Sequence, residues 1–229
     1  MKDIGVLSVV ATPIGNLGDI TLRAIETLKQ ADAIACEDTR VTSKLLSRFD
    51  IQKPLLVYHA RSGRLAADKV LTLLGAGKRV ALVTDAGTPG ISDPGNELVR
   101  LAYERLGSDV KVEAIPGPSA LAAALSIAGL HTHDFVFLGF LPHKKGRETL
   151  FKEIASSERA VVFYESTHRI EKALESLEKV LDEKREIAVA REITKFHESL
   201  VRGSATEVRA YFTEHADEVR GEFVVIVGP

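Results

Sequence analysis

The chain has 229 residues, of which 45% are apolar and 27% are charged, and its formal net charge is −2. This composition is typical of an ordinary globular protein and excludes a disordered, fibrous or disulfide-built chain. The length suits one large core or two domains of roughly a hundred residues each. The single cysteine, Cys36, cannot form an internal disulfide, no apolar run reaches the roughly 20 residues of a membrane span, and no signal segment is recognisable. We therefore expect a soluble cytoplasmic protein.

In the first half, short apolar runs alternate with segments of helical spacing. The predicted strands are residues 6–10, 33–36, 55–58, 80–83 and 110–114. Between them, apolar residues share one helical face, as in the trio of Leu22, Ile25 and Leu28. This βαβ alternation predicts an α/β domain with a mostly parallel sheet.

The alternation breaks at Ile-Pro-Gly-Pro-Ser-Ala, residues 115–120, where Pro118 suits the first turn of a helix that Gly129 would end. We place the domain boundary here, between an N-terminal domain of residues 1–117 and a C-terminal domain of residues 118–229. In the second half the predicted strands are residues 135–140, 160–164, 186–190, 197–203 and 222–227, and the predicted helices are residues 147–155, 168–181 and 206–214. Hairpin-like pairing near the end favours a mixed-sheet α/β domain.

Two loops with several glycines follow predicted strands, at residues 11–21 (A-T-P-I-G-N-L-G-D-I-T) and 83–95 (V-T-D-A-G-T-P-G-I-S-D-P-G). Loops at the carboxyl ends of strands form the ligand crevice of an open α/β sheet. Neither loop carries the phosphate-binding or dinucleotide-binding fingerprint, which argues against ATP and NAD. A ligand bound chiefly by main-chain groups, with Asp85 or Asp93 accepting bonds from a hydroxyl or an amine, fits an adenosine-type cofactor.

Carboxylates follow strands in both halves. At residues 35–40, Ala-Cys-Glu-Asp-Thr-Arg, Glu37 or Asp38 could accept a proton while Arg40 holds an anion; alternatively, Asp38 caps the next helix. Residues 164–169 and 191–195 end strands in a similar way, and structural ion pairs could explain either. The H-x-H pair at 131 and 133 lacks a nearby third ligand, so we expect no metal site.

Basic residues concentrate in two stretches. Residues 40–69 hold seven lysines and arginines against two aspartates, and residues 141–152 hold four against one glutamate. Solvated helix faces account for most such clusters, and contact with a polyanion is the alternative.

Eight motifs, in order and across nearly the whole chain, resemble the bacterial ribosomal RNA small-subunit methyltransferase I family. They are A-T-P-I-G-N-L-G-D-I-T, C-E-D-T-R, D-A-G-T-P-G-I-S-D-P-G, I-P-G-P-S-A, G-F-L-P-H-K-K-G-R, F-Y-E-S-T-H-R, R-E-I-T-K and G-E-F-V-V-I-V-G. The resemblance implies a tetrapyrrole methylase-like fold of two α/β domains, with S-adenosylmethionine in the cleft between them. It also implies 2′-O-methylation of a cytidine ribose in small-subunit ribosomal RNA, and a homodimer. Where the tetrapyrrole enzymes carry G-x-G-x-G-D, only Gly18 and Asp19 align, which favours the ribosomal branch.

The resemblance also implies roles for individual residues. The expected cofactor-binding residues are Pro13, Gly15, Asp85, Gly87, Thr88, Ser92, Gly117, Ser119 and Tyr164. A ribose hydroxyl needs a base, for which the candidates are Glu37, Asp38 and Glu165. The expected contacts to RNA phosphates are Arg40, Lys44, Arg61, Arg64, Lys144, Lys145 and Arg147. No metal is required, because the leaving group carries its own positive charge. A tetrapyrrole (porphyrinoid) methylase of the same superfamily and a non-catalytic cofactor-binding module remain alternatives.

Overall fold

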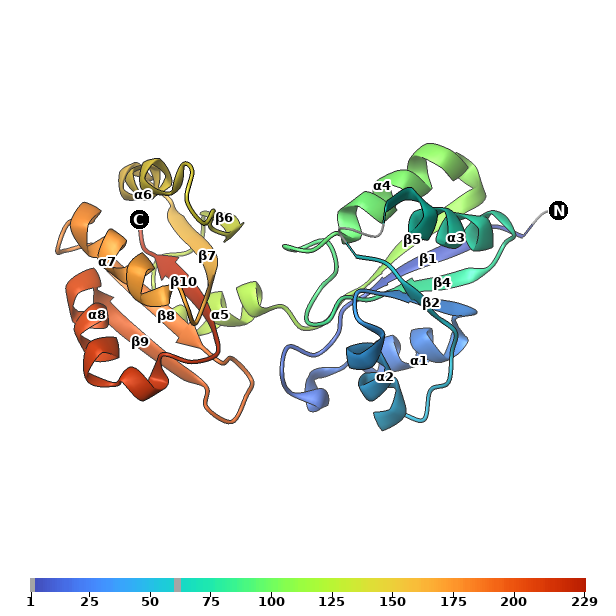
Figure 1. Cartoon of the computed structure of the whole chain (residues 1–229), viewed down its shortest axis with the longest axis horizontal. Coiled ribbons are helices and arrows are strands. Elements are labelled where there is room, and N and C mark those ends of the chain that lie inside the picture. Colours follow the sequence, from blue (N-terminus) through green and yellow to red (C-terminus); the bar gives the residue numbers. More distant parts are fainter. Residues whose placement is uncertain (1–2, 60–62) are drawn as a thin grey trace. The chain divides into compact units, whose positions relative to one another are not determined.

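The computed structural model describes residues 3–59 and 63–229. The chain divides into two compact units, residues 1–119 and residues 120–229 (Figure 1). The boundary expected from the sequence, after residue 117, lies two residues before this division. Each unit holds one five-stranded sheet.

The N-terminal unit is built on a sheet in which every pairing is parallel. Its strands are β1 (Gly5–Val10), β2 (Ala33–Cys36), β3 (Leu55–Val57), β4 (Arg79–Leu82) and β5 (Val110–Ile115), in the order β3-β2-β4-β1-β5. The central strands are almost continuously apolar because helices cover both faces. The predicted parallel α/β domain is confirmed.

Helices on the two faces of this sheet determine where its loops emerge. They are α1 (Leu22–Gln30), α2 (Thr39–Arg48), α3 (Gly63–Gly75) and α4 (Gly95–Leu106), with short 3-10 turns η1 (Leu17–Asp19) and η2 (Gly107–Asp109). Buried residues of α1 and α2 pack in one cluster, and those of α3 and α4 pack in another. Neighbouring strands β1 and β4 therefore send their connections to opposite faces of the sheet, the arrangement at whose carboxyl ends open α/β sheets bind ligands.

One predicted helical face needs correction. Leu22 is 80% exposed, because the buried face of α1 runs through Ala24 and Leu28 instead. Thr21 caps this helix by accepting a hydrogen bond from the Ala24 amide, so Leu22 lies in the first turn at the surface.

The C-terminal unit has a mixed sheet, as predicted. Its strands are β6 (Phe135–Phe140), β7 (Ala160–Ser166), β8 (Glu186–Arg191), β9 (Ser199–Ser204) and β10 (Glu222–Val227), in the order β6-β7-β10-β8-β9. The pairing of β6 with β7 is parallel and the other pairings are antiparallel. Strand β9 begins two residues later than predicted, because its partner β8 ends at Arg191, which pairs with Ser199.

The helices of this unit are α5 (Ala120–Ala128), α6 (Arg147–Ser156), α7 (Ile170–Val180) and α8 (Ala205–Glu214), followed by the short turn η3 (Ala216–Glu218). Phe151 of α6, Leu174 of α7 and Phe212 of α8 join one core cluster with Phe163 of β7. Helix α5 packs against β8 and β10. Within the residues that the structure describes, no helix is both long and apolar enough to span a bilayer.

Candidate active site

Two of the predicted ligand-binding loops are joined by reciprocal hydrogen bonds. The Thr12 amide donates to the Gly87 carbonyl at 2.9 Å, and the Gly87 amide donates to the Thr12 carbonyl at 3.1 Å. The buried Thr12 hydroxyl also donates to the Thr84 carbonyl at 3.1 Å. The loops that follow β1 and β4 therefore form one connected structure at the edge of the sheet.

The segment after β5 lies against the same pair of loops. The Ala11 amide donates to the Ile115 carbonyl at 3.1 Å, and the Thr88 hydroxyl donates to the Pro118 carbonyl at 3.0 Å. A β-carbon on Gly117 would lie 3.1 Å from Cβ of Ala11, so glycine allows this close approach. The stretches around Gly15, Gly87 and Gly117 therefore meet at one edge of the N-terminal sheet.

The loop after β4 holds an unusual backbone. Gly87 has φ of +86°, which glycine adopts readily, whereas Ser92 has φ of +66°, an uncommon conformation for a residue with a side chain. The Asp93 carboxylate stabilises this shape by accepting hydrogen bonds from the amides of Gly90 and Gly95 at 2.8 and 2.7 Å. Asp93 is therefore occupied within its own loop. Among the residues that the structure describes, Asp85 accepts one hydrogen bond, from the Asp38 amide at 3.1 Å, and is the better placed of the two aspartates to contact a ligand.

Glu37 follows β2 at this edge and is partly buried. Its Oε2 accepts a hydrogen bond from the Thr84 hydroxyl at 3.0 Å. Burial raises the pKa of the Glu37 carboxyl; the Thr84 hydrogen bond opposes this effect, and the charges of Asp93 and Asp85 reinforce it. A raised pKa makes a carboxylate a stronger proton acceptor near neutral pH.

Asp38 has a different role. It is the N-cap of α2, accepting the Arg40 amide at 2.8 Å, and its carboxylate pairs with the Arg40 guanidinium at 2.5 Å. These bonds lower the pKa of Asp38 to about 2, which makes it a weak base. The capping interpretation is confirmed, and Arg40, although 86% exposed, is already paired.

Glu165, the third candidate base, ends β7 in the C-terminal unit and is completely buried. Its Oε1 forms an ion pair with Arg169 Nε at 2.7 Å, and its Oε2 accepts a hydrogen bond from Arg147 Nη2 at 3.1 Å. The Ser166 amide donates a further hydrogen bond to Oε1 at 2.9 Å. A carboxylate enclosed by three donors is poorly placed to meet a substrate hydroxyl.

Tyr164 precedes Glu165 and supports the start of α5. Its hydroxyl accepts the Leu121 amide at 3.2 Å, and its ring contacts Phe137 and Phe140 edge-on, with centroids 5.0 and 5.4 Å away. Burial raises the pKa of its hydroxyl.

The predicted RNA-binding residues fall into three groups. Lys44, Arg64, Lys144 and Lys145 are exposed and have no ion-pair partner in the part of the chain that the structure describes. Arg40 and Arg147 are paired with Asp38 and Glu165. Arg61 lies outside the described residues.

The sequence interpretation missed Thr12 and Thr84. Both threonines are buried at the points where an apolar strand meets a glycine loop, and this position was the only available signal. Arg169 lies in the stretch 164–169, for which structural ion pairs were the alternative interpretation, and its ion pair with buried Glu165 confirms that alternative. Among residues 3–59 and 63–229, no group of three or more His, Cys, Asp and Glu side chains could hold a metal ion.

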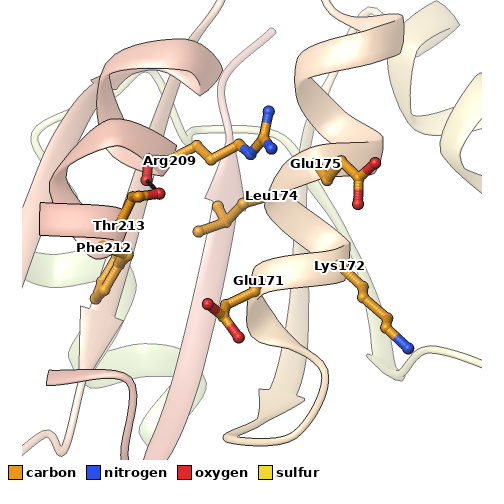
Figure 2. Close-up of a pocket in the computed structure, with 7 residues that line it drawn as sticks. All are labelled: Glu171, Lys172, Leu174, Glu175, Arg209, Phe212 and Thr213. Atoms are coloured by element: carbon orange, nitrogen blue, oxygen red, sulfur yellow. Dashed lines mark hydrogen bonds between the residues drawn. The ribbon is translucent and has the colours of Figure 1, made fainter. Parts of the chain in front are cut away.

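A separate pocket of about 200 Å³ lies between α7 and α8 (Figure 2). Figure 2 shows Glu171 and Glu175 on one side and Arg209 and Thr213 on the other. None of the predicted site residues lines it.

Comparison with known proteins identifies relatives of this chain. Residues 6–209 match the family of tetrapyrrole (corrin/porphyrin) methylases. A ribosomal RNA small subunit methyltransferase I from Synechocystis is 47% identical over 98% of this chain and 79% of its own length. The protein of the same name from Thermotoga maritima is 41% identical over 98% of both chains.

Solved structures show a related fold. The uroporphyrin-III C-methyltransferase of Thermus thermophilus, complexed with S-adenyl homocysteine, aligns with a TM-score of 0.64 at 23% identity. The alignment covers 98% of this chain and 97% of the other. The methyltransferase CobJ aligns with a TM-score of 0.70 at 22% identity, over 98% of this chain and 94% of the other.

Proposed function

Because the chain belongs to the ribosomal RNA small subunit methyltransferase I family of the tetrapyrrole methylases, and is an S-adenosylmethionine-dependent methyltransferase, we propose that it methylates the ribose 2′-hydroxyl of a cytidine in small-subunit ribosomal RNA. The names of the relatives support ribosomal RNA of the small subunit as the substrate. The observation that carries the chemistry is the meeting of three strand-end loops beside the partly buried Glu37.

The loops suit an adenosine-type cofactor. The amides of Gly15, Thr88 and Ser119 have no hydrogen-bond partner among the described residues, so they can donate to a ligand. Asp85 keeps one carboxylate oxygen for a hydroxyl or an amine. The proposed contacts are Pro13, Gly15, Asp85, Gly87, Thr88, Ser92, Gly117 and Ser119. Tyr164 is proposed to complete the set from the C-terminal unit.

Glu37 is the proposed proton acceptor. The cofactor supplies a methyl group that its sulfonium already activates, so the remaining need is a reactive oxygen nucleophile. Glu37 can take the proton of the ribose hydroxyl, since burial raises the pKa of its carboxyl. Asp38 is a weaker base because its pKa is about 2, and Glu165 is enclosed by arginines.

Unpaired cations are the proposed contacts to the RNA backbone. Lys44 and Arg64 in the N-terminal unit, and Lys144 and Lys145 in the C-terminal unit, are exposed. Lysine and arginine contacts to phosphates position a nucleic acid without reading its sequence. Arg61, from its place in the first basic stretch, is proposed to join them. We further propose a cytoplasmic homodimer, since two-fold dimers are the commonest oligomers.

The proposal is tested with small ribosomal subunits that lack the modification, incubated with the protein and S-adenosylmethionine carrying a labelled methyl group. The expected result is label on the 2′-oxygen of one cytidine ribose. Label on a base, or none, would contradict the proposal. A parallel incubation with a porphyrinoid substrate tests the alternative of a porphyrinoid methylase. That alternative predicts label on the porphyrinoid and no salt-sensitive binding to ribosomal subunits.

A further inference from the structure

The segment between β6 and α6 combines exposed charge with one buried end. We refer to residues 141–146, Leu-Pro-His-Lys-Lys-Gly, as the basic loop. Leu141 is buried at one end, whereas the side chains of His143, Lys144 and Lys145 are exposed. Neither lysine has an ion-pair partner among residues 3–59 and 63–229. Nothing within that range therefore neutralises the charge at the tip of this loop.

Two arginines hold the first residues of the basic loop. Arg169 Nη1 donates to the Leu141 carbonyl at 2.8 Å, and Arg147 Nη1 donates to the Pro142 carbonyl at 3.2 Å. The Arg147 guanidinium also lies over the ring of Phe151, 5.2 Å from its centre. The backbone just before the lysines is thus tied to the C-terminal unit by two separate guanidinium groups.

Both guanidinium groups converge on Glu165. The Arg147 and Arg169 side chains are only 14% and 16% exposed, and the Glu165 side chain is 0% exposed. Removing Glu165 would leave two arginines with no carboxylate, so the position of both depends on it. One carboxylate against two guanidiniums also leaves one positive charge uncompensated beside the lysines.

Stability alone is a weak explanation for this cluster. Replacing a buried ion pair with apolar residues of similar volume is often neutral or stabilising, because burying charges costs solvation energy. Buried ionic groups are better explained where they fix a geometry, and here they fix the backbone that carries Lys144 and Lys145.

We propose that Glu165 is a positioning residue: through Arg147 and Arg169, it holds the basic loop in the shape in which Lys144 and Lys145 contact the sugar-phosphate backbone of RNA. This inference rests on the proposed function as a ribosomal RNA methyltransferase. The partner is identified by its charge, because the tip of the loop offers unpaired ammonium groups and no exposed large apolar side chain.

The test compares Glu165→Gln with Glu178→Gln. Glu178 is the matched control, since it pairs with Arg209 in the same unit, and within the described residues no hydrogen bond or ion pair joins it to the basic loop. Affinity for unmodified small subunits is measured across a series of salt concentrations, together with KM and kcat for methyl transfer. For Glu165→Gln we expect roughly tenfold weaker binding and a salt slope reduced by about one to two, as phosphate contacts are lost.

We also expect Glu165→Gln to raise KM for the subunit more than it changes kcat, and Glu178→Gln to behave like the wild type. An unchanged salt slope and KM in Glu165→Gln would overturn the inference. If Glu165→Gln does not fold, Arg169→Lys carries the same test, because a lysine cannot bond to Glu165 and the Leu141 carbonyl in the same fork geometry.

A combined variant distinguishes a positioning role of Glu165 from a general structural role, because it measures whether the effect of Glu165 depends on Lys144 and Lys145. Replacing Lys144 and Lys145 with alanine should weaken subunit binding strongly in the wild type. In the Glu165→Gln background the same replacement should cause a loss of affinity at least fivefold smaller. Equal losses in both backgrounds would show that Glu165 does not act through the loop. If the wild-type protein itself binds subunits without salt dependence, the proposed function fails. If wild-type binding to subunits is salt-sensitive but the effects of Glu165→Gln and of the lysine replacements simply add, the proposed function stands and only this inference fails.

Discussion

Glu37 and Glu165 both lie where a buried strand ends, one in each unit, yet their surroundings differ. Glu37 is partly buried and its oxygen meets a neutral hydroxyl, that of Thr84. Glu165 is fully buried and meets two guanidiniums and an amide. The first arrangement leaves a carboxylate able to take up a proton, whereas in the second the carboxylate fixes the positions of two guanidiniums and an amide around it. Position at a strand end therefore does not determine the role of a carboxylate; its hydrogen-bond donors do.

The largest effect is expected for Glu37→Gln. An amide cannot accept the ribose proton, so the rate of methyl transfer should fall by roughly 10²- to 10⁴-fold. Binding of S-adenosylmethionine should change little. Single-turnover transfer to unmodified subunits measures the first quantity, and calorimetric titration measures the second. A rate within threefold of the wild type would show that Glu37 is not the base, and the contrast drawn between Glu37 and Glu165 would then be wrong.

Glu165→Ala should act mainly on stability. It leaves Arg147 and Arg169 largely buried without a counter-charge, which should lower the free energy of unfolding by about 3 kcal/mol. Urea denaturation of the full chain measures this change. Glu178→Ala is the control, since it removes a more exposed pair and should cost less than about 1 kcal/mol. Equal losses in the two variants would argue against the special position of Glu165.

Thr84→Val should shift the pH profile of methyl transfer. The raised pKa of Glu37 means that activity is lost as pH falls through that pKa, because the carboxylate becomes protonated. The Thr84 hydrogen bond lowers the pKa of Glu37. Its removal should therefore raise that pKa further and move the acid limb of the kcat/KM profile to higher pH. The expected result is a several-fold loss on the acid side and little change above neutral pH. A limb that moves to lower pH would show that another group controls it.

The smallest effect is expected for Asp38→Asn. Asparagine caps helices about as well as aspartate, and the ion pair with Arg40 is exposed. Methyl transfer should therefore stay within about twofold of the wild type in the same single-turnover assay. A loss near that of Glu37→Gln would instead identify Asp38 as the base.

The sequence predicted both sheets and the loops of the N-terminal unit because these depend on local patterns. Apolar runs of four and five residues define β2 and β10, and the turn-forming residues at 84–95 mark a strand-end loop. The capping role of Asp38 was also readable, since its bonds reach only two residues along the chain.

The long-range contacts around Glu165 could not be predicted from the sequence. Arg147 lies 18 residues from Glu165, and the amide that binds Tyr164 lies 43 residues away. Such contacts depend on how strands and helices pack, which no local pattern records. The sequence therefore offered Glu37, Asp38 and Glu165 as candidate bases, with capping or ion pairs as alternatives for the last two, and the partners of each carboxylate in the fold decide among these roles.

The paired amides of Thr12 and Gly87 have a consequence for dynamics. Because each residue donates to the other, neither amide can open to solvent without breaking the same two-bond bridge. Their deuterium uptake should therefore follow a single opening rate, and a nucleoside seated on either loop should slow uptake at both positions by the same factor.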